Sequence, residues 1–186
     1  MTNTMHRLFI CLLLCVAGLG LLSGPAIAAE AEAYLLLNVK SDGVLSVRDL
    51  VFTKVGSGEE IRIRDMLTLG RAESPKYVME PLSAGEYYLS SIYPNVNVND
   101  AGRRIEVDES DGVITILPST INYIGDFILT SRERGSGVAS SFSYEPNSST
   151  LIAAVTAERE LFERLDIVVS IAGNAPVPVD KKLLGL

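Results

Sequence analysis

A buried β-strand is predicted by the stretch Ile121-Asn122-Tyr123-Ile124-Gly125-Asp126-Phe127-Ile128-Leu129, because apolar and aromatic residues dominate it. Gly125 and Asp126 interrupt its middle. A glycine inside a strand marks a bulge or a close approach of backbone. A buried carboxylate must find a cation or several hydrogen-bond donors, because leaving it unpaired would cost several kcal/mol. We therefore predict a bulge or close contact at Gly125, and a structural anchor at Asp126 with a ligand contact as the alternative.

Strict alternation assigns the side chains of this strand to two faces. One face receives Tyr123, Gly125, Phe127 and Leu129, and the other receives Asn122, Ile124, Asp126, Ile128 and Thr130. The second face is mixed in character. Asp126 is therefore expected under a helix, or at the edge of the contact that the helix makes.

The flanking sequence also predicts strands, because β-branched and aromatic runs alternate with Gly, Asn and Asp turns between Tyr34 and Tyr144. One hairpin is predicted where residues 50–55 turn at 56–58 and return through 61–64. A second is predicted where residues 103–107 turn at 110–112 into 113–117. Strands at such short intervals are typical of a sandwich or barrel.

A helix is predicted near 148–165, where apolar residues recur with helical spacing. The apolar stripe consists of Leu151, Ala154, Val155, Leu161, Phe162 and Leu165. Glu158 falls inside this stripe, which places a carboxylate at the edge of the packed face. Residues 166–171 could form a last strand, and 173–186 are expected to leave as a C-terminal tail. The expected domain is thus a single one, residues 30–172.

The first 29 residues resemble a secretory signal peptide. Arg7 precedes an apolar run from Leu8 to Leu22, and small residues follow, with cleavage expected after Ala28 or Ala29. The run is short for a membrane span, so no stable span is expected after cleavage. We therefore predict a periplasmic or secreted protein.

Composition excludes several chemistries. Both cysteines and the only histidine, His6, lie within residues 1–29, and the chain has no Trp. The remainder therefore cannot supply a Cys nucleophile, a His general base, a disulfide or a Cys/His zinc site, and no cofactor is indicated. Residues 30–186 carry 15 basic and 23 acidic residues, a net charge of −8. Such a surface disfavours nucleic acid as a partner.

The spacing Leu-x-x-Gly-x-Tyr occurs at Leu82, Gly85 and Tyr87. It resembles the tyrosine corner of Greek-key sandwiches, in which the Tyr hydroxyl bonds to nearby backbone. Together with residues 122–126, this stretch is similar to the prealbumin-like, carboxypeptidase-regulatory-like domains of bacterial envelope proteins. The resemblance covers roughly residues 34–129 and implies structural roles for Gly85 and Tyr87. The expected fold is mainly β, an antiparallel prealbumin-like or immunoglobulin-like sandwich with one C-terminal α-helix.

Other candidate sites have weaker patterns. The residues Asn95, Asn97, Asn99 and Glu106 partly match a calcium loop, but Asp100 stands where that loop requires Gly. Tyr88 is a candidate binding aromatic. Asp126, Glu158, Glu86 and Glu80 could supply the two carboxylates of a hydrolase, which lie about 5 to 10 Å apart.

The favoured function is non-catalytic: an exported cell-envelope protein that acts as a structural module or binds another envelope protein or an envelope component. A sheet edge is one route for such binding. Asp126, Glu158 and Tyr88 are its candidate binding residues. The first alternative is a module that binds a small ligand, a glycan or calcium. A hydrolase that uses only carboxylates is the third hypothesis.

Overall fold

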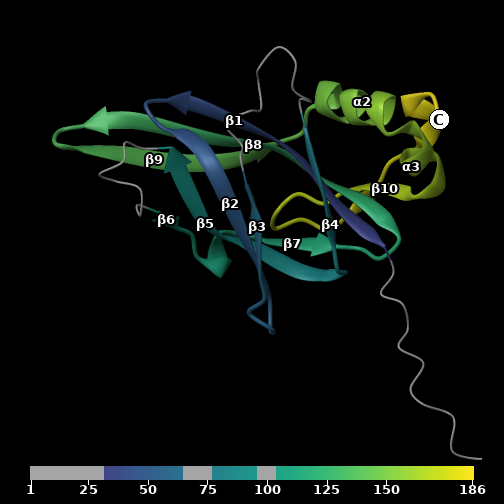
Figure 1. Ribbon diagram of the computed structural model, residues 1–186, viewed down its shortest axis with the longest axis horizontal. Coiled ribbons are helices and arrows are strands. Elements are labelled where there is room, and N and C mark those ends of the chain that lie inside the picture. Colours follow the sequence, from purple (N-terminus) through teal and green to yellow (C-terminus); the bar gives the residue numbers. More distant parts are fainter. Residues whose placement is uncertain (1–31, 65–76, 96–103) are drawn as a thin grey trace, which may run out of the picture.

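The computed structural model of this chain describes residues 32–64, 77–95 and 104–186. In these ranges eleven strands form two sheets, and short helices lie against one of them (Figure 1). The prediction of a mainly β fold is confirmed. The signal peptide predicted over residues 1–29 lies outside the described residues.

Sheet A has six strands in the order β11-β10-β8-β1-β4, with β9 added beside β8. These strands are β1 (Ala33–Gly43), β4 (Val78–Leu82), β8 (Thr120–Arg134), β9 (Gly137–Glu145), β10 (Asp166–Val169) and β11 (Val177–Pro178). Sheet B has the order β3-β2-β5-β6, with β7 also on β5. Its strands are β2 (Ser46–Lys54), β3 (Glu60–Ile63), β5 (Gly85–Asn95), β6 (Ile105–Glu106) and β7 (Val113–Ile116), and a short 3₁₀ turn, η3 (Glu109–Asp111), precedes β7.

A hydrophobic cluster joins the two sheets. Alternate residues of β1, including Leu35 and Leu37, contribute to it from sheet A, and Phe52 and Ile92 contribute from sheet B. All four side chains are almost completely buried. Because period-2 alternation directs these residues to one face of each sheet, this shared core holds the sheets face to face.

A second cluster covers the opposite face of sheet A. Its helices are α2 (Ser148–Ala157) and α3 (Arg159–Arg164), followed later by the 3₁₀ turn η4 (Lys181–Leu184). Leu151 and Phe162 from the helices pack with Leu36 and Tyr123 from the sheet. The predicted apolar stripe is thus largely buried, but the single predicted helix is divided at Glu158. The described part of the chain contains no helix long and apolar enough to span a membrane.

The prediction of an antiparallel fold is wrong for sheet A, because β8 runs parallel to both β1 and β10. Parallel neighbours need a long crossover rather than a tight turn. Between β1 and β8, the chain passes through the strands of sheet B. Between β8 and β10, helices α2 and α3 lie on the crossover and return the chain to the start of β8, where Asp166 pairs with Thr120. Turn residues alone gave no sign of this crossover.

One predicted hairpin is confirmed and the other is wrong. β2 and β3 pair as expected. β6 and β7 do not pair with each other, because both pair with β5: β6 opposite Ser91 and Ile92, β7 opposite residues 85–88. The eleven residues of β5 are enough for both short strands to bind it at different places.

β8 contains a bulge at Gly125. Leu36 and Asn38 are two residues apart on β1, but their partners Tyr123 and Asp126 are three residues apart on β8. Gly125 has φ +91°, and a Cβ there would lie 3.1 Å from the carbonyl oxygen of Glu145. Both the backbone angle and the close approach therefore require glycine.

The bulge overturns the predicted faces of this strand. Tyr123 lies with Asp126 on the helix side, and Ile124 joins Phe127 in the core between the sheets. Strict alternation had paired Tyr123 with Phe127, and Ile124 with Asp126. An extra residue in the strand reverses the assignment on one side of the bulge.

Residues 173–186, expected to leave as a tail, instead pack against the domain. β11 pairs with β10, and the Val179 N–H donates to the Ile167 carbonyl at 2.9 Å. Leu184 and Leu186 then pack against the helical cluster.

Candidate functional site

Asp126 is fully buried at the junction of β8 and the start of α2. Lys40 Nζ lies 2.6 Å from Oδ2, and the Asn147 side-chain amide donates to the same oxygen at 2.6 Å. The Thr150 hydroxyl donates to Oδ1 at 2.7 Å. The longer contacts to Asn38 and Tyr123 are 3.3 and 3.2 Å. The carboxylate thus has both the cation and the donors that its burial demands.

These partners determine the charge state of Asp126. Burial raises the pKa of its carboxyl, but hydrogen bonds from Lys40, Asn147 and Thr150, with the Lys40 charge, outweigh burial and hold the pKa below its ordinary value. Lys40 is about half exposed, whereas the Asp126 side chain is 1% exposed. Asp126 is therefore an ionised carboxylate whose hydrogen bonds and charge are satisfied by residues of the same domain.

The same cluster fixes where α2 begins. Asn147 is the N-cap, and its side-chain oxygen accepts from the Ser149 N–H at 3.0 Å while its amide binds Asp126. The Asn147 backbone N–H donates to the Tyr123 hydroxyl at 2.9 Å. Burial is the main cause of the raised pKa of Tyr123. One side of β8 is thereby tied to the first turn of the helix.

Sequence reasoning did not identify Lys40, Asn147 or Thr150 as partners of Asp126. The apolar spacing predicts a helix near 148–165 but assigns no role to Asn147, which precedes it. Lys40 lies opposite Ile128 on β1, two residues along from the register partner of Asp126. Finding this pair required the parallel register of β1 and β8, which the local sequence does not encode.

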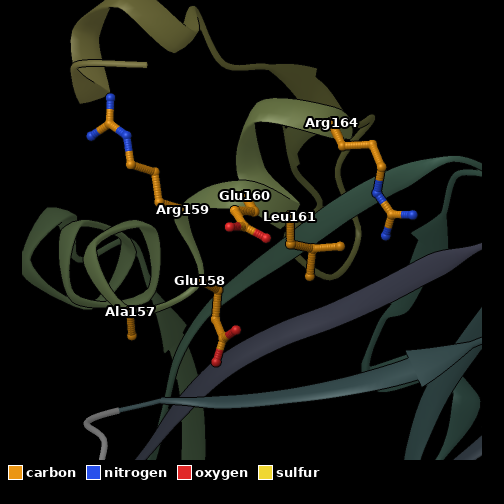
Figure 2. Close-up of a pocket in the computed structure, with 6 residues that line it drawn as sticks. All are labelled: Ala157, Glu158, Arg159, Glu160, Leu161 and Arg164. Atoms are coloured by element: carbon orange, nitrogen blue, oxygen red, sulfur yellow. The ribbon is translucent and has the colours of Figure 1, made fainter.

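Glu158 lies at the other end of α2 as its C-cap and is exposed. Its carboxylate accepts a hydrogen bond from Tyr77 at 3.3 Å. Burial, followed by the Glu158 charge, raises the pKa of Tyr77. The described lining of a surface depression of about 660 Å³ surrounds the break between the helices: Ala157, Glu158, Arg159, Glu160, Leu161 and Arg164 (Figure 2).

The two arginines that line this depression already form ion pairs with other residues. Arg159 pairs with Glu163 at 2.9 Å, and Arg164 pairs with Glu32 at 3.0 Å. Figure 2 shows the two arginines pointing away from Glu158 on opposite sides. The described side chains that line the depression therefore do not form a convergent set of charges.

Asp126 and Glu158 are not brought together. The ten residues of α2 separate them, a rise of about 15 Å at 1.5 Å per residue. A pair of catalytic carboxylates lies about 5 to 10 Å apart. This geometry does not favour the two residues as the acid and base of a hydrolase.

Tyr87 and Gly85 lie where the chain passes from β4 in sheet A to β5 in sheet B. The Tyr87 hydroxyl donates to the Ser83 carbonyl at 3.0 Å, the bond expected of a tyrosine corner. Lys54 Nζ donates to the Ser83 hydroxyl at 2.7 Å and lies 5.7 Å from the Tyr87 ring centroid. Tyr87 is therefore placed to fix the crossing between the sheets.

The remaining predicted binding residues are dispersed. Tyr88 is half-buried on β5 opposite Thr53 and Val113, next to the core residue Tyr87. Glu106 is exposed and pairs with Arg104 at 2.7 Å, and Asn95 ends β5. Asn97 and Asn99 of the calcium hypothesis lie outside the described residues. In the described ranges, no three acidic, His or Cys residues are grouped as metal ligands.

β9 is a further feature that the sequence reasoning did not single out. Gly135 and Ser136 form a two-residue turn from β8, and β9 then pairs with β8 along its whole length. No described strand pairs with the other edge of β9. Its side chains from residue 137 to 144 are all uncharged. The alternation Phe142-Ser143-Tyr144 after Gly135 could have indicated this strand.

Comparison with known proteins adds no assignment: no family model matches the chain, and no curated protein matches it.

Proposed function

We propose that this chain is a non-catalytic exported cell-envelope protein that binds a protein partner in the envelope by strand addition to β9. In this proposal residues 1–29 are a signal peptide cleaved after Ala28 or Ala29, and the domain acts in the periplasm or outside the cell. The finer fold assignment, a prealbumin-like or immunoglobulin-like sandwich, is part of the proposal. The shared core of the two sheets and the tyrosine-fixed crossing between them support it.

The open edge of β9 is the observation that carries the proposal. Natural proteins protect exposed edges with charges, Pro or very short strands. Among the other described edges, β4 contains Glu80 and Pro81, and β3 contains Glu60 and Arg62, whereas β6 and β11 have only two residues each and β7 has four. β9 has nine residues and carries no charge before Glu145. An edge left open in this way suits a partner strand.

Strand addition would use the same interactions that hold the strands of sheet A together. An added strand would bind through main-chain hydrogen bonds, while alternate side chains give specificity. Phe142 and Tyr144 are half-buried beside Phe127, with ring centroids between 5.6 and 6.1 Å apart. A partner strand could extend this aromatic cluster, and the small Ser141 and Ser143 leave the outer face accessible.

Affinity capture from cross-linked cells tests the proposal. A tagged wild-type chain is compared with Ser141→Lys/Ser143→Lys, in which two charges line the edge. The matched control, Ser57→Lys/Thr156→Lys, adds the same charge at exposed positions on a turn and on α2. We expect a reproducible envelope partner with the wild type and the control, and its loss with the β9 variant. Equal capture by all three folded proteins would refute the use of this edge.

The depression at the helix break favours a second candidate, a module that binds a small ligand or a glycan. Its volume, about 660 Å³, falls in the range of ligand sites, and Tyr77 and Glu158 offer a hydroxyl and a carboxylate beside it. Binding of an oligosaccharide panel, measured by calorimetry and abolished by Glu158→Ala, would favour this function. The same experiment with Ca²⁺ tests the calcium alternative.

A further inference from the structure

The two ends of β9 carry opposite charges that have no ion-pair partner among the described residues. Glu145 ends the strand, and the one side-chain hydrogen bond that its carboxylate makes within the described residues is accepted from the Ser143 hydroxyl at 3.5 Å. Arg134, at the other end, lies opposite Gly137 in the β8–β9 register and is exposed. The neighbouring Arg132, by contrast, pairs with Asp42 at 2.7 Å.

Glu145 and Arg134 lie on the same face of the sheet. Residues 137, 139, 141, 143 and 145 alternate with those that face the core, and Arg134 is the register partner of residue 137. The eight steps along the nine residues from Gly137 to Glu145 span about 27 Å at 3.4 Å per step. The edge is therefore uncharged in its middle and has one anionic and one cationic end.

We propose that the strand added to β9 is β9 of a second copy, antiparallel to the first, about a two-fold axis at Ser141. This inference rests on the proposed function, because it names the occupant of the same edge. A two-fold axis places residue 145 of each copy opposite residue 137 of the other. Arg134 of the second copy lies on β8, one strand beyond Gly137. Because glycine has no side chain, the long Arg134 side chain can reach Glu145 across it, so each of the two charges gains an opposite partner.

The same register matches the rest of the strand. Ser141 faces Ser141, and Ser143 faces Ala139, so only small side chains meet on the outer face. On the core side Phe142 faces Ser140, and Tyr144 faces Val138, which places a large side chain opposite a smaller one in each pair. A parallel pairing in register would instead bring the two Glu145 ends together, far from the Arg134 of either copy. The charge pattern therefore selects the antiparallel dimer.

Cysteine cross-linking of purified protein tests the dimer. In a Cys11→Ser/Cys15→Ser background an introduced thiol is the only one in the chain. Residues directly opposite in antiparallel strands have Cβ atoms about 4.5–5.5 Å apart, close enough for a disulfide with slight adjustment. We expect Ser141→Cys to form a disulfide-linked dimer on mild oxidation. The exposed control Ser57→Cys should form no more than a collisional background.

A charge-reversal cycle tests the register by sedimentation equilibrium. Glu145→Arg and Arg134→Glu should each weaken dimerisation about tenfold, because each creates two like-charge contacts per dimer. The double variant should recover wild-type affinity, because the pairs are restored with reversed sign. Sedimentation of the wild type as a monomer, equal cross-linking at positions 57 and 141, or failure of the double variant to recover would each overturn the proposal.

These outcomes are separable from failure of the proposed function. If the protein is monomeric but an envelope partner is still lost with Ser141→Lys/Ser143→Lys, the edge is used by a different protein and only the self-pairing is wrong. If neither self-pairing nor capture depends on the β9 lysines, both proposals are wrong.

Discussion

At the scale of single residues, Asp126 shows how a buried charge can serve structure. Lys40 and two strong donors, Asn147 and Thr150, satisfy its carboxylate, and through Asn147 it holds the start of α2. The sequence allowed this role to be predicted, because an unpaired carboxylate in a buried strand is too costly. The partners were unpredictable from local pattern, because they come from a parallel neighbour and from a helix twenty residues further along the chain.

Replacing Asp126 with Asn should destabilise the protein by about 3 kcal/mol at pH 7, because a buried donor replaces an acceptor that Lys40, Asn147 and Thr150 all use. The lowered folded-state pKa means that the carboxylate stabilises the protein above the unfolded-state pKa, about 3.9. This contribution is lost as pH falls through the folded pKa. Urea unfolding at pH 7, 5 and 3 should therefore show the two proteins converge only at acid pH.

The control for this series is Glu133→Gln, which removes an exposed carboxylate at the tip of the β8–β9 hairpin. Its unfolding free energy should stay within about 0.5 kcal/mol of the wild type at pH 7. An Asp126→Asn protein as stable as this control would contradict the anchor role.

Removing the hydroxyl of Tyr144 and removing that of Tyr123 should have different effects on the stability of the protein. The Tyr144 hydroxyl is buried and has no hydrogen-bond partner among the described residues, whereas the Tyr123 hydroxyl accepts from the Asn147 N–H. Tyr144→Phe should leave stability unchanged or raise it by about 1 kcal/mol, and Tyr123→Phe should lower it by about 1–2 kcal/mol. Denaturant midpoints of the two variants decide this. A loss on Tyr144→Phe as large as on Tyr123→Phe would reveal a bond that the structure lacks.

At the scale of elements, β8 marks where prediction from sequence succeeds and where it fails. Its strand character and the special role of Gly125 follow from composition. The assignment of its side chains to two faces could not be predicted in this way, because alternation is valid only up to a bulge. The bulge exchanges the sides on which Tyr123 and Ile124 lie. Similarly, the turn before β7 indicated a hairpin, but the long β5 binds β6 and β7 separately.

Gly125→Ala should destabilise the protein by about 1–3 kcal/mol, because φ +91° is strained for a side chain and the new Cβ would press on the Glu145 backbone. The matched control is Gly56→Ala, which has a similar φ of +83° but nothing within 4 Å of the new Cβ. Thermal unfolding should show a larger loss at Gly125 than at Gly56. Equal losses would mean that backbone angle alone, and not the contact with β9, requires the glycine.

At the scale of the whole molecule, the two hydrophobic clusters share β1 and β8. Leu35 and Leu37 belong to the cluster between the sheets, and Leu36 belongs to the helical cluster. Neither layer can therefore lose its packing without disturbing the other. The mainly β class was predictable from turn spacing, whereas the helical layer on sheet A and the packed C-terminus depend on contacts distant in sequence.

This sharing predicts a single cooperative unfolding transition. Leu184 is half-buried against the helical cluster. Leu184→Ala should therefore lower the free energy of unfolding of the whole protein by about 1–2 kcal/mol. Leu183→Ala, at a position 82% exposed, should change it by less than about 0.5 kcal/mol. Unfolding followed by far-ultraviolet circular dichroism and by tyrosine fluorescence should give the same midpoint for each protein. Separate midpoints would show that the helices unfold independently of the sheets.

The central claim is that the β9 edge is where this molecule meets its partner. Site-specific photo-cross-linking in living cells tests it most directly, with a photoreactive amino acid at Ser141 and, as the control, at the exposed Ser57 of the β2–β3 turn. We predict a discrete cross-linked product from position 141 only, consisting of two copies of this chain. A product with a different envelope protein would keep the edge as the binding site and contradict only the self-pairing. No product from position 141, or the same products from both positions, would contradict the claim.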